Sequence, residues 1–485
     1  MSDKSIAKAT YSSQIEVEVE ADRAKHTRYG GILAYQRVWE RFGCDQLLQE
    51  TGVTYGQAEN KGPEMTFALS TAPLIEAGSV RQVAQRYGGE PSELEADELV
   101  SHLLPVSFSQ RQLSRFMNQE RHDWAGLNWG RVLALQQLKE TAMTEEGVLI
   151  LDDFTLAKPY ARVMDYLEPV WDNCLKRKVH GYLIVHLYYY HPNRPSYPLV
   201  LTPWLKTSAT GEKKAKTARR RAKPDEELSR LDLGHQALAA VKTRQLPFAA
   251  VVFDSWYTVR WLSHELTRLN IPWIGEVSAN QKLIVEGQKL SVAQIWERYA
   301  DQMTPVEGLK SGLKAYALSA INPADAYTKV DQPVQLVLTE GLHQPRDKDQ
   351  GRHLLISNQR LWSTRRLVRL FSYRPHIEPR HRLGKQEQGW LDFHTQSLAA
   401  LQAHLAISLL RDTLLHLLRL WVPALAEYSF AQMIRYWIGY IADLTVLAVG
   451  KLKVHLGPDH PAWAFILGSD PPPASLLSFS VVNFH

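Results

Sequence analysis

The chain has 485 residues, of which 45% are hydrophobic, with two cysteines and a net charge of 56 − 51 = +5. At roughly 100–200 residues per domain this length predicts several domains with sizeable cores, and the composition excludes collagen-like, disulfide-stapled and wholly disordered proteins. Cys44 and Cys174 have neither a Cys-x-x-Cys spacing nor a histidine at a ligand interval, which argues against a structural zinc module and fits a reducing cytoplasm.

The N-terminal third reads as helical. Amphipathic segments occur near Ala34–Glu50, Ser79–Tyr87 and Ser109–Trp124, and no strand alternation is recognised there. The second and third segments begin with a serine that can act as an N-cap, and they carry Arg and Gln on the polar face. That composition suits a helix lying against DNA, although plain packing explains either helix equally well.

The pattern changes at Gly147-Val-Leu-Ile-Leu-Asp-Asp153, an apolar run that predicts a buried strand ending in two acids. Strands are expected at 182–190 and 197–204, a helix at 225–242, and another buried strand at Phe248–Asp254. A helix at 258–269 and a strand at 272–278 complete a mixed α/β layer. Asp153 and Asp254 thus each end a predicted strand, where ligands bind in open α/β sheets.

A strongly basic stretch interrupts this layer. Residues 206–223 contain eight basic side chains and one acid, and residues 360–385 again contain eight basic side chains and one acid, Glu378. Such clusters favour a phosphate backbone, because each neutralised phosphate releases counterions; the alternative is a solvated basic face. The side chains of the first cluster expected to contact DNA are Lys213, Lys214, Arg219, Arg220 and Arg221.

Residues 280–358 read as a β-rich insertion, with short strands near 314–321, 334–339 and 353–357. Residues 360–422 and 428–451 read as helical, and a loose tail is expected from Gly468. The most apolar stretch, Leu398–Leu418, includes His404, Arg411, Asp412 and His416. We therefore interpret it as a buried helix of a soluble, cytoplasmic protein with no membrane span.

Three acids along the chain could act together. Carboxylates of Asp153 and Asp254 placed side by side would repel one another unless a cation lies between them, and Mg²⁺ prefers such oxygen ligands. Glu378 can supply a third ligand, which would let the site hold two metals for phosphoryl transfer. The alternative is that each acid caps a strand or pairs with a nearby arginine, such as Glu378 with Arg374 or Arg382.

These residues resemble the DDE transposases of bacterial insertion sequences. The resembling blocks are Leu151-Asp-Asp153, Val252-Phe-Asp-Ser-Trp-Tyr257 and the segment Phe371–Lys385. The last block is similar to a Tyr-x₂-Arg-x₃-Glu-x₆-Lys signature, with Arg374, Glu378 and Lys385 at the required spacings, although Phe371 replaces the tyrosine. In the first block Asp152 competes with Asp153; we favour Asp153, because the metal ligand of that family follows another acid.

The resemblance implies a ribonuclease-H-like catalytic core formed by residues 146–279 and 359–425, with the β-rich insertion at 280–358. Residues 1–145 would be an all-α DNA-binding domain and residues 426–485 a C-terminal helical region with its tail. Asp153, Asp254 and Glu378 would hold Mg²⁺, with Mn²⁺ as a substitute.

The same resemblance assigns further roles. Arg374 and Lys385 would contact phosphates beside the scissile bond, and His381 could bond a phosphate or have no catalytic task. Trp256 could stack on a base, although core packing is the simpler account.

The implied function is metal-dependent cleavage at transposon ends followed by strand transfer, by a homodimer bound to double-stranded transposon ends and target DNA. The alternatives are a two-metal nuclease without strand transfer, and a DNA-binding regulator or domesticated transposase without catalysis. Glu387 is the alternative third ligand if Glu378 proves to be structural.

Overall fold

The computed structural model describes most of the chain between residues 31 and 422. The described residues are 7–11, 15–19, 29, 31–55, 61–95, 98–101, 106–161, 163–172, 175–205, 228–309, 312–320, 332–342, 351–392, 396–422, 425, 428–429, 432–433, 453–454 and 479–480. The predicted basic side chains at 213–221, most of the predicted helix at 428–451 and most of the predicted tail therefore lie outside the described residues. The chain divides into two compact units, the first formed by 1–134, 163–165 and 383–485, and the second by 135–162 and 166–382.

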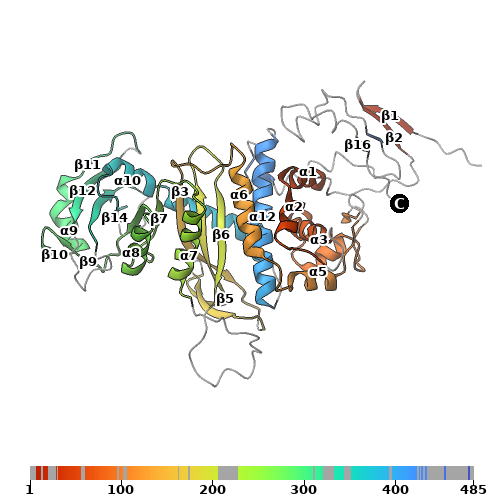
Figure 1. The fold of residues 1–485 in the computed structure, drawn as a ribbon, viewed down its shortest axis with the longest axis horizontal. Helices are drawn as coiled ribbons and strands as arrows, with labels where there is room; N and C mark the ends of the chain where they lie inside the picture. The colour runs from red at the N-terminus through yellow and green to blue at the C-terminus, as the bar shows by residue number, and fades with distance from the viewer. Residues whose placement is uncertain are drawn as a thin grey trace, which may run out of the picture. The chain divides into compact units, whose positions relative to one another are not determined.

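The first unit is mainly helical (Figure 1). Its described elements are β1 (Ala7–Tyr11), β2 (Ile15–Val19), α1 (Ile32–Phe42), α2 (Cys44–Glu50), α3 (Lys61–Ser70), η2 (Ala72–Ile75), α4 (Val80–Arg86), α5 (Gln110–Met117), α6 (Trp124–Gln136), α12 (Leu398–Trp421), β15 (Lys453–Val454) and β16 (Phe479–Ser480). The three predicted helical segments are present. The antiparallel pair β1–β2 is an exception to the expected helical character, and its signal was the alternation of apolar and acidic residues at 15–19.

Serine caps set the start of two of these helices, as predicted. The Ser79 hydroxyl accepts a hydrogen bond from the backbone N–H of Gln82, at 3.2 Å, and begins α4. Ser109 and Gln112 form a reciprocal capping box at the start of α5. Each cap satisfies helix N–H groups that have no partner within the helix.

The second unit is built on one ten-stranded mixed sheet. Its strands are β3 (Val148–Ala157), β4 (Glu168–Asp172), β5 (Arg177–Tyr190), β6 (Tyr197–Trp204), β7 (Val251–Phe253), β8 (Trp273–Glu276), β11 (Thr304–Pro305), β12 (Lys314–Ala320), β13 (Val334–Glu340) and β14 (His353–Ser357). A separate hairpin joins β9 (Lys282–Val285) and β10 (Gln288–Ser291), and the helices are α7 (Arg230–Thr243), α8 (Arg260–Arg268), α9 (Val292–Tyr299), η4 (Ala300–Gln302), α10 (Thr364–Phe371), η5 (Arg374–His376) and α11 (Ile377–Gln386).

The strands follow the order β11-β12-β13-β14-β8-β7-β3-β5-β4, with β6 also paired to β5. Only β3, β7 and β8 are parallel to one another, and the other pairs are antiparallel. The predicted mixed α/β sheet is confirmed. The strands expected in a separate β-rich insertion instead extend this sheet, because β14 pairs with β8.

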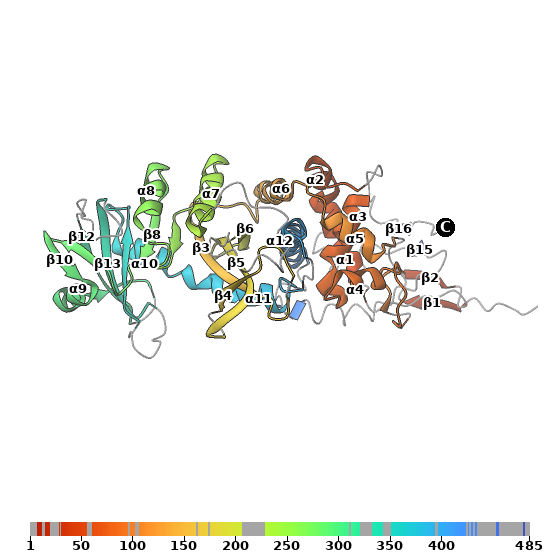
Figure 2. The same ribbon diagram turned by 90° about the horizontal axis from the view of Figure 1, so that it is seen from below.

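Helices cover both faces of the sheet. Figure 2 shows α7 and α8 on one face and α10 and α11 on the other. The side that faces α10 and α11 buries Ile150, Val252, Val368 and Phe371 in one apolar cluster. On the opposite face α7 approaches closely, because a Cβ at Gly234 would lie 2.9 Å from a methyl carbon of Leu151.

The helix α12 contains the apolar stretch that we interpreted as a buried helix. It is long and apolar enough to cross a membrane by composition, but 78% of its most apolar window is buried inside the protein. The charged residues Arg411 and Asp412 on this helix are also buried. This burial agrees with a core helix.

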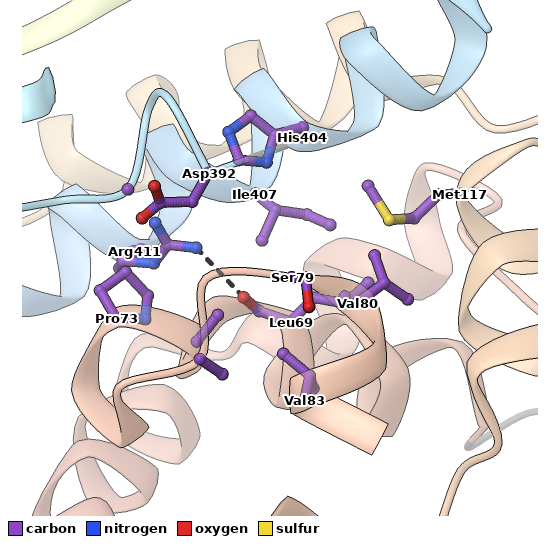
Figure 3. A pocket seen from close by; sticks show the side chains of 13 residues that line it. Leu69, Pro73, Ser79, Val80, Val83, Met117, Asp392, His404, Ile407 and Arg411 are labelled. Carbon is purple, nitrogen blue, oxygen red and sulfur yellow. Dashed lines mark hydrogen bonds between the residues drawn. The ribbon is translucent and has the colours of Figure 1, made fainter. Parts of the chain in front are cut away.

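Arg411 connects α12 to the end of α3. Its guanidinium donates hydrogen bonds to the carbonyl oxygens of Leu69, Ser70 and Gln388, at 3.1, 2.6 and 2.5 Å. Figure 3 shows this residue beside a cavity lined by apolar side chains such as Val83 and Ile407 and by polar ones such as Asp392 and His404. The volume of the cavity is about 30 Å³. That volume is about one water molecule, so the cavity is too small to hold a substrate.

We expect Arg411→Met to destabilise the protein by about 3 kcal/mol, because three buried carbonyl oxygens lose their donors. The measurement is the free energy of unfolding in denaturant. Arg81→Met, at an exposed position on α4, is the matched control and should change it by less than about 0.5 kcal/mol. Equal stabilities for the two variants would contradict this account of Arg411.

Candidate active site

Two neighbouring parallel strands bring acids together at the centre of the sheet. Leu149, Ile150 and Leu151 of β3 are paired in register with residues 251 to 253 of β7, so the next positions, Asp152 and Asp254, follow side by side. Asp254 directly follows the end of β7, as predicted. The first acids do not end their strand, because β3 continues through them to Ala157.

The alternation of side chains along β3 separates the two adjacent acids. Asp152 shares its face with Val148 and Ile150, toward α10 and α11, whereas Asp153 shares the opposite face with Leu151, toward α7. The two carboxylates consequently have different partners.

Arg374 joins three carboxylates on the first face. Its Nη2 lies 3.2 Å from Oδ2 of Asp152 and 3.5 Å from Oδ2 of Asp254, and its Nη1 lies 3.1 Å from Oε1 of Glu378. Arg374 comes from η5 and Glu378 from the first turn of α11. The structure therefore joins Asp152, rather than the favoured Asp153, to the other two acids.

Charge and burial act strongly on this group. Burial raises the pKa of Asp152 to about 7; Arg374 opposes that rise and the negative charge of Asp254 adds to it. Burial alone would lower the pKa of Arg374, but the carboxylates of Asp152, Asp254 and Glu378 raise it above its ordinary value. The site is thus a largely buried arginine shared by two partly buried acids, Asp152 and Asp254, and one exposed acid, Glu378.

Asp254 is also fixed by its own loop. Its Oδ1 accepts hydrogen bonds from the backbone N–H groups of Trp256, at 3.0 Å, and Tyr257, at 3.4 Å. The Thr258 hydroxyl donates to the backbone carbonyl of Asp254, at 3.1 Å. These bonds hold the turn after β7 and leave Oδ2 directed at Arg374.

On the opposite face, Asp153 has its own arginine. Its Oδ2 lies 2.8 Å from Nη1 of Arg230, the first residue of α7, and 3.4 Å from the Tyr257 hydroxyl. Burial raises the pKa of Asp153, and Arg230 opposes that rise. Arg230 was missed from the sequence; its signal was a cation directly after a serine that could cap a helix.

The remaining predicted residues on α11 differ in position. His381 is buried, its Nε2 lies 2.9 Å from Nδ1 of His186, and its ring packs on Phe154 with centroids 4.4 Å apart. It faces the core, so we do not assign it a phosphate contact. Lys385 lies seven residues after Glu378 on the same helix and is partly exposed.

The chemistry of these donors suits a divalent cation. Asp152, Asp254 and Glu378 offer carboxylate oxygens, the ligands that Mg²⁺ and Mn²⁺ prefer, and they already share one cationic group. Among the described residues, no three acidic, histidine or cysteine side chains stand at metal-ligating spacing. The residue types fit a divalent cation, but the three carboxylates are not arranged here as a ligand cluster, and Arg374 supplies the positive charge that they share.

Comparison with known proteins identifies the family. The family described as DDE superfamily endonuclease matches residues 98–343, a little over half of the chain. The chain belongs to the DDE superfamily endonucleases. Nucleases of this superfamily generally use divalent metal ions, and the predicted ribonuclease-H-like α/β class is confirmed for this DDE endonuclease. The matched region includes both Asp152 and Asp254 and ends before Glu378.

Other comparisons add less. No curated protein matches the chain. Among solved structures, the chain is similar to a piggyBac transposase in a synaptic complex with hairpin DNA, at 11% identity and a TM-score of 0.40, with 95% of this chain and 91% of that chain covered.

The raised pKa of Asp152 predicts a dependence of stability on pH. The pKa of Asp152 is about 7 in the folded state, against an ordinary value of 3.8, so the folded state binds this proton more tightly than the unfolded state does. Protonation of Asp152 therefore stabilises the fold, and this stabilisation is lost as pH rises from about 4 to about 7. In EDTA, the free energy of unfolding of the wild type should therefore fall relative to Asp152→Asn by roughly 1 kcal/mol per pH unit over this range.

Glu265→Gln is the control for that measurement. A hydrogen bond from Arg268 lowers the pKa of Glu265, so the wild type should gain stability relative to this variant as pH rises through the carboxyl range. A difference between wild type and Asp152→Asn that stays constant from pH 4 to 7 would show that Asp152 titrates normally.

Proposed function

We propose that this DDE endonuclease is a transposase that cuts DNA at transposon ends and transfers the freed strand to a target. The observation that carries the proposal is the joining of Asp152, Asp254 and Glu378 through Arg374 at the centre of the sheet. The family supplies DNA cleavage as the reaction class. The spacing of Arg374, Glu378 and Lys385 supports the insertion-sequence branch with the Arg-x₃-Glu-x₆-Lys signature.

Each side chain has a distinct task in this proposal. Asp152, Asp254 and Glu378 hold the divalent cations, Mg²⁺ in the cell and Mn²⁺ as a substitute. When bound, such cations make water a stronger nucleophile and stabilise the leaving oxygen of the phosphodiester. Arg374 holds the carboxylates in place before the metal binds. Afterwards it binds phosphate, because its planar guanidinium can contact two phosphate oxygens at once. Lys385 contributes a point charge further along α11.

The surface of α10 supports binding to the DNA backbone. Arg365, Arg366 and Arg369 are exposed on this eight-residue helix, whose buried side chains include Leu367 and Val368. The helix contains no acidic residue. An exposed row of arginines without acids favours phosphates, and it reads no base sequence. The basic residues at 206–223 would add positive charge to this DNA-binding surface. A homodimer would hold two transposon ends.

The acids are tested by cleavage of a labelled duplex that carries the end of the encoding element. We expect Asp152→Asn, Asp254→Asn and Glu378→Gln to lower metal-dependent cutting by roughly 100-fold or more, with duplex binding retained. EDTA should stop cutting by the wild type, and Mn²⁺ should restore it.

Asp153→Asn is the matched neighbour of Asp152→Asn and should retain metal-dependent cutting at a reduced rate. If Asp153→Asn abolishes cutting and Asp152→Asn does not, Asp153 is the ligand. Cutting without strand transfer would indicate a nuclease, and binding without cutting under any metal would indicate a regulator.

The basic surface is tested separately by the salt dependence of binding to a duplex of arbitrary sequence. Replacing Arg365, Arg366 and Arg369 by Gln should weaken binding and reduce the slope of log affinity against log salt by about 2 to 3, because each phosphate that an arginine no longer neutralises removes about 0.9 from that slope.

The control for the salt series replaces Arg268 and Arg298 by Gln. Both are exposed in the same unit, but acids neutralise them, with Nη2 of Arg268 at 2.6 Å from Glu265 and Nη2 of Arg298 at 2.8 Å from Glu286. The slope should therefore change little in the control. An unchanged slope in the α10 variant would remove this helix from the DNA-binding surface.

A further inference from the structure

The hairpin of β4 and β5 extends past the rest of the sheet. β3 pairs with β5 as far as Gly181 and β6 pairs with it as far as Leu183, whereas β4 pairs with β5 down to Arg177. In the part of the chain that the structure describes, residues 169–172 and 175–180 therefore form a two-stranded extension, which we call the β4–β5 ribbon. A two-stranded ribbon of this kind is narrow enough to enter a groove of duplex DNA.

Two hydrogen bonds fix this ribbon to the end of β3. The backbone N–H of Lys158 donates to the carbonyl of His180, at 2.6 Å, and the Thr155 hydroxyl donates to the carbonyl of Trp171, at 3.0 Å. The ribbon is thus positioned by the same strand that carries Asp152.

One face of the β4–β5 ribbon is exposed and carries no acid. Trp171 lies opposite Lys178 and Pro169 lies opposite His180, and all four side chains are exposed. The indole of Trp171 is 53% exposed. Both acids of β4 lie on the other face of the ribbon, because side chains alternate along a strand.

The tip of the ribbon is both apolar and basic. Leu175 is 52% exposed, and it is followed by three exposed cations, Lys176, Arg177 and Lys178. The carboxylate of Asp172 accepts a hydrogen bond from the backbone N–H of Leu175, at 2.9 Å, which holds the turn. Cations next to large apolar side chains suit DNA, because the cations neutralise phosphates and the apolar groups pack in a groove.

The exposed face of the ribbon is directed to the same side of the sheet as Asp152. Asp152 lies opposite His186 on β5, and alternation along β5 places His186, His180 and Lys178 on one face. Lys178 and His186 are 8 positions apart, which at ~3.3 Å per residue is about 26 Å. This distance corresponds to about 8 base pairs of duplex, at ~3.4 Å each.

We propose that the β4–β5 ribbon binds duplex DNA about 8 base pairs from the scissile phosphate. The inference rests on the proposed function, because it takes the substrate of the acids to be DNA. A duplex that lies along β5 contacts the metal ligands at one point and the ribbon at the other. Lys176, Arg177 and Lys178 bind its phosphates, and Trp171 packs against sugars and base edges in a groove.

The test measures binding, in EDTA, to duplexes that carry the end of the encoding element. One probe extends about 16 base pairs on both sides of the scissile phosphate, and two others are cut back to about 4 base pairs on one side or the other, which is short of the ribbon at about 8. The wild type should bind one of the shortened probes more weakly than the long probe, and this identifies the side on which the ribbon lies.

The contribution of the indole is tested with the same probes. Trp171→Ala should weaken binding of the long probe by about tenfold, as expected for removal of one large aromatic anchor, and should not affect the probe shortened on the ribbon side. Trp261→Ala is the matched control, because Trp261 is 42% exposed on α8, which covers the other face of the sheet. It should affect none of the probes.

The contribution of the cations is tested by the salt dependence of binding to the long probe. Arg177→Gln combined with Lys178→Gln should reduce the slope of log affinity against log salt by about 2, since each phosphate contact contributes about 0.9. Trp171→Ala should leave that slope unchanged, because it removes no charge. The matched control combines Lys282→Gln with Lys289→Gln, two exposed lysines on the β9–β10 hairpin of the same unit, and should change the slope little.

Equal binding of all three probes by the wild type, with no effect of Trp171→Ala on any of them, would overturn the proposal. The same result combined with a shift from dimer to monomer for Trp171→Ala in sedimentation would also overturn it, and would assign the ribbon to a second copy of this chain. Because these assays are performed without metal, their failure is distinct from failure of the nuclease, which shows as absent cutting of the long probe by the wild type in Mg²⁺.

Discussion

The arrangement of the candidate site depends on one constraint, the placement of three carboxylates around the largely buried guanidinium of Arg374. Carboxylates this close together in a partly buried site repel one another strongly unless a cation neutralises their charge. Arg374 supplies that cation, and it comes from η5, directly before the helix that carries Glu378. The position of α11 against the sheet is thereby linked to the charge balance at Asp152 and Asp254.

The sheet makes this convergence possible. Because β3 and β7 are parallel and in register, Asp152 and Asp254 are neighbours across the sheet although they are 102 positions apart in sequence. The helices α10 and α11 cover the face to which Asp152 points, and α7 covers the other. A single strand therefore presents two adjacent acids to two different environments, and we assign the metal to Asp152 alone.

This arrangement suits an enzyme that must both hold metals and bind DNA. A metal site requires several carboxylates close together whose charge an arginine or a metal neutralises, as on the face of the sheet that carries Arg374. The exposed arginines of α10 add a sequence-independent contact with the backbone.

Many elements of the fold and part of the candidate site could be predicted from the sequence. Apolar runs of four to eight residues located β3, β5, β6, β7, β8 and the strands β12 to β14, and serine caps located α4 and α5, because these signals are local. Motif spacing and the family resemblance predicted that Asp254, Arg374 and Glu378 belong to one site. Strands β1 and β2 were missed even though residues 15–19 alternate, because the surrounding region was read as helical.

Only the tertiary structure decided which side chains meet. The run ending in Asp152 and Asp153 predicted a strand but did not reveal that it continues to Ala157, nor which helix covers which face, so it could not separate the two acids. The same holds for His381. Its helix was predicted, but its burial depends on the residues that pack against that helix, here His186 and Phe154. Local sequence determines the backbone conformation of each element, but the partner of a polar side chain depends on strand register and on the packing of segments distant in the chain.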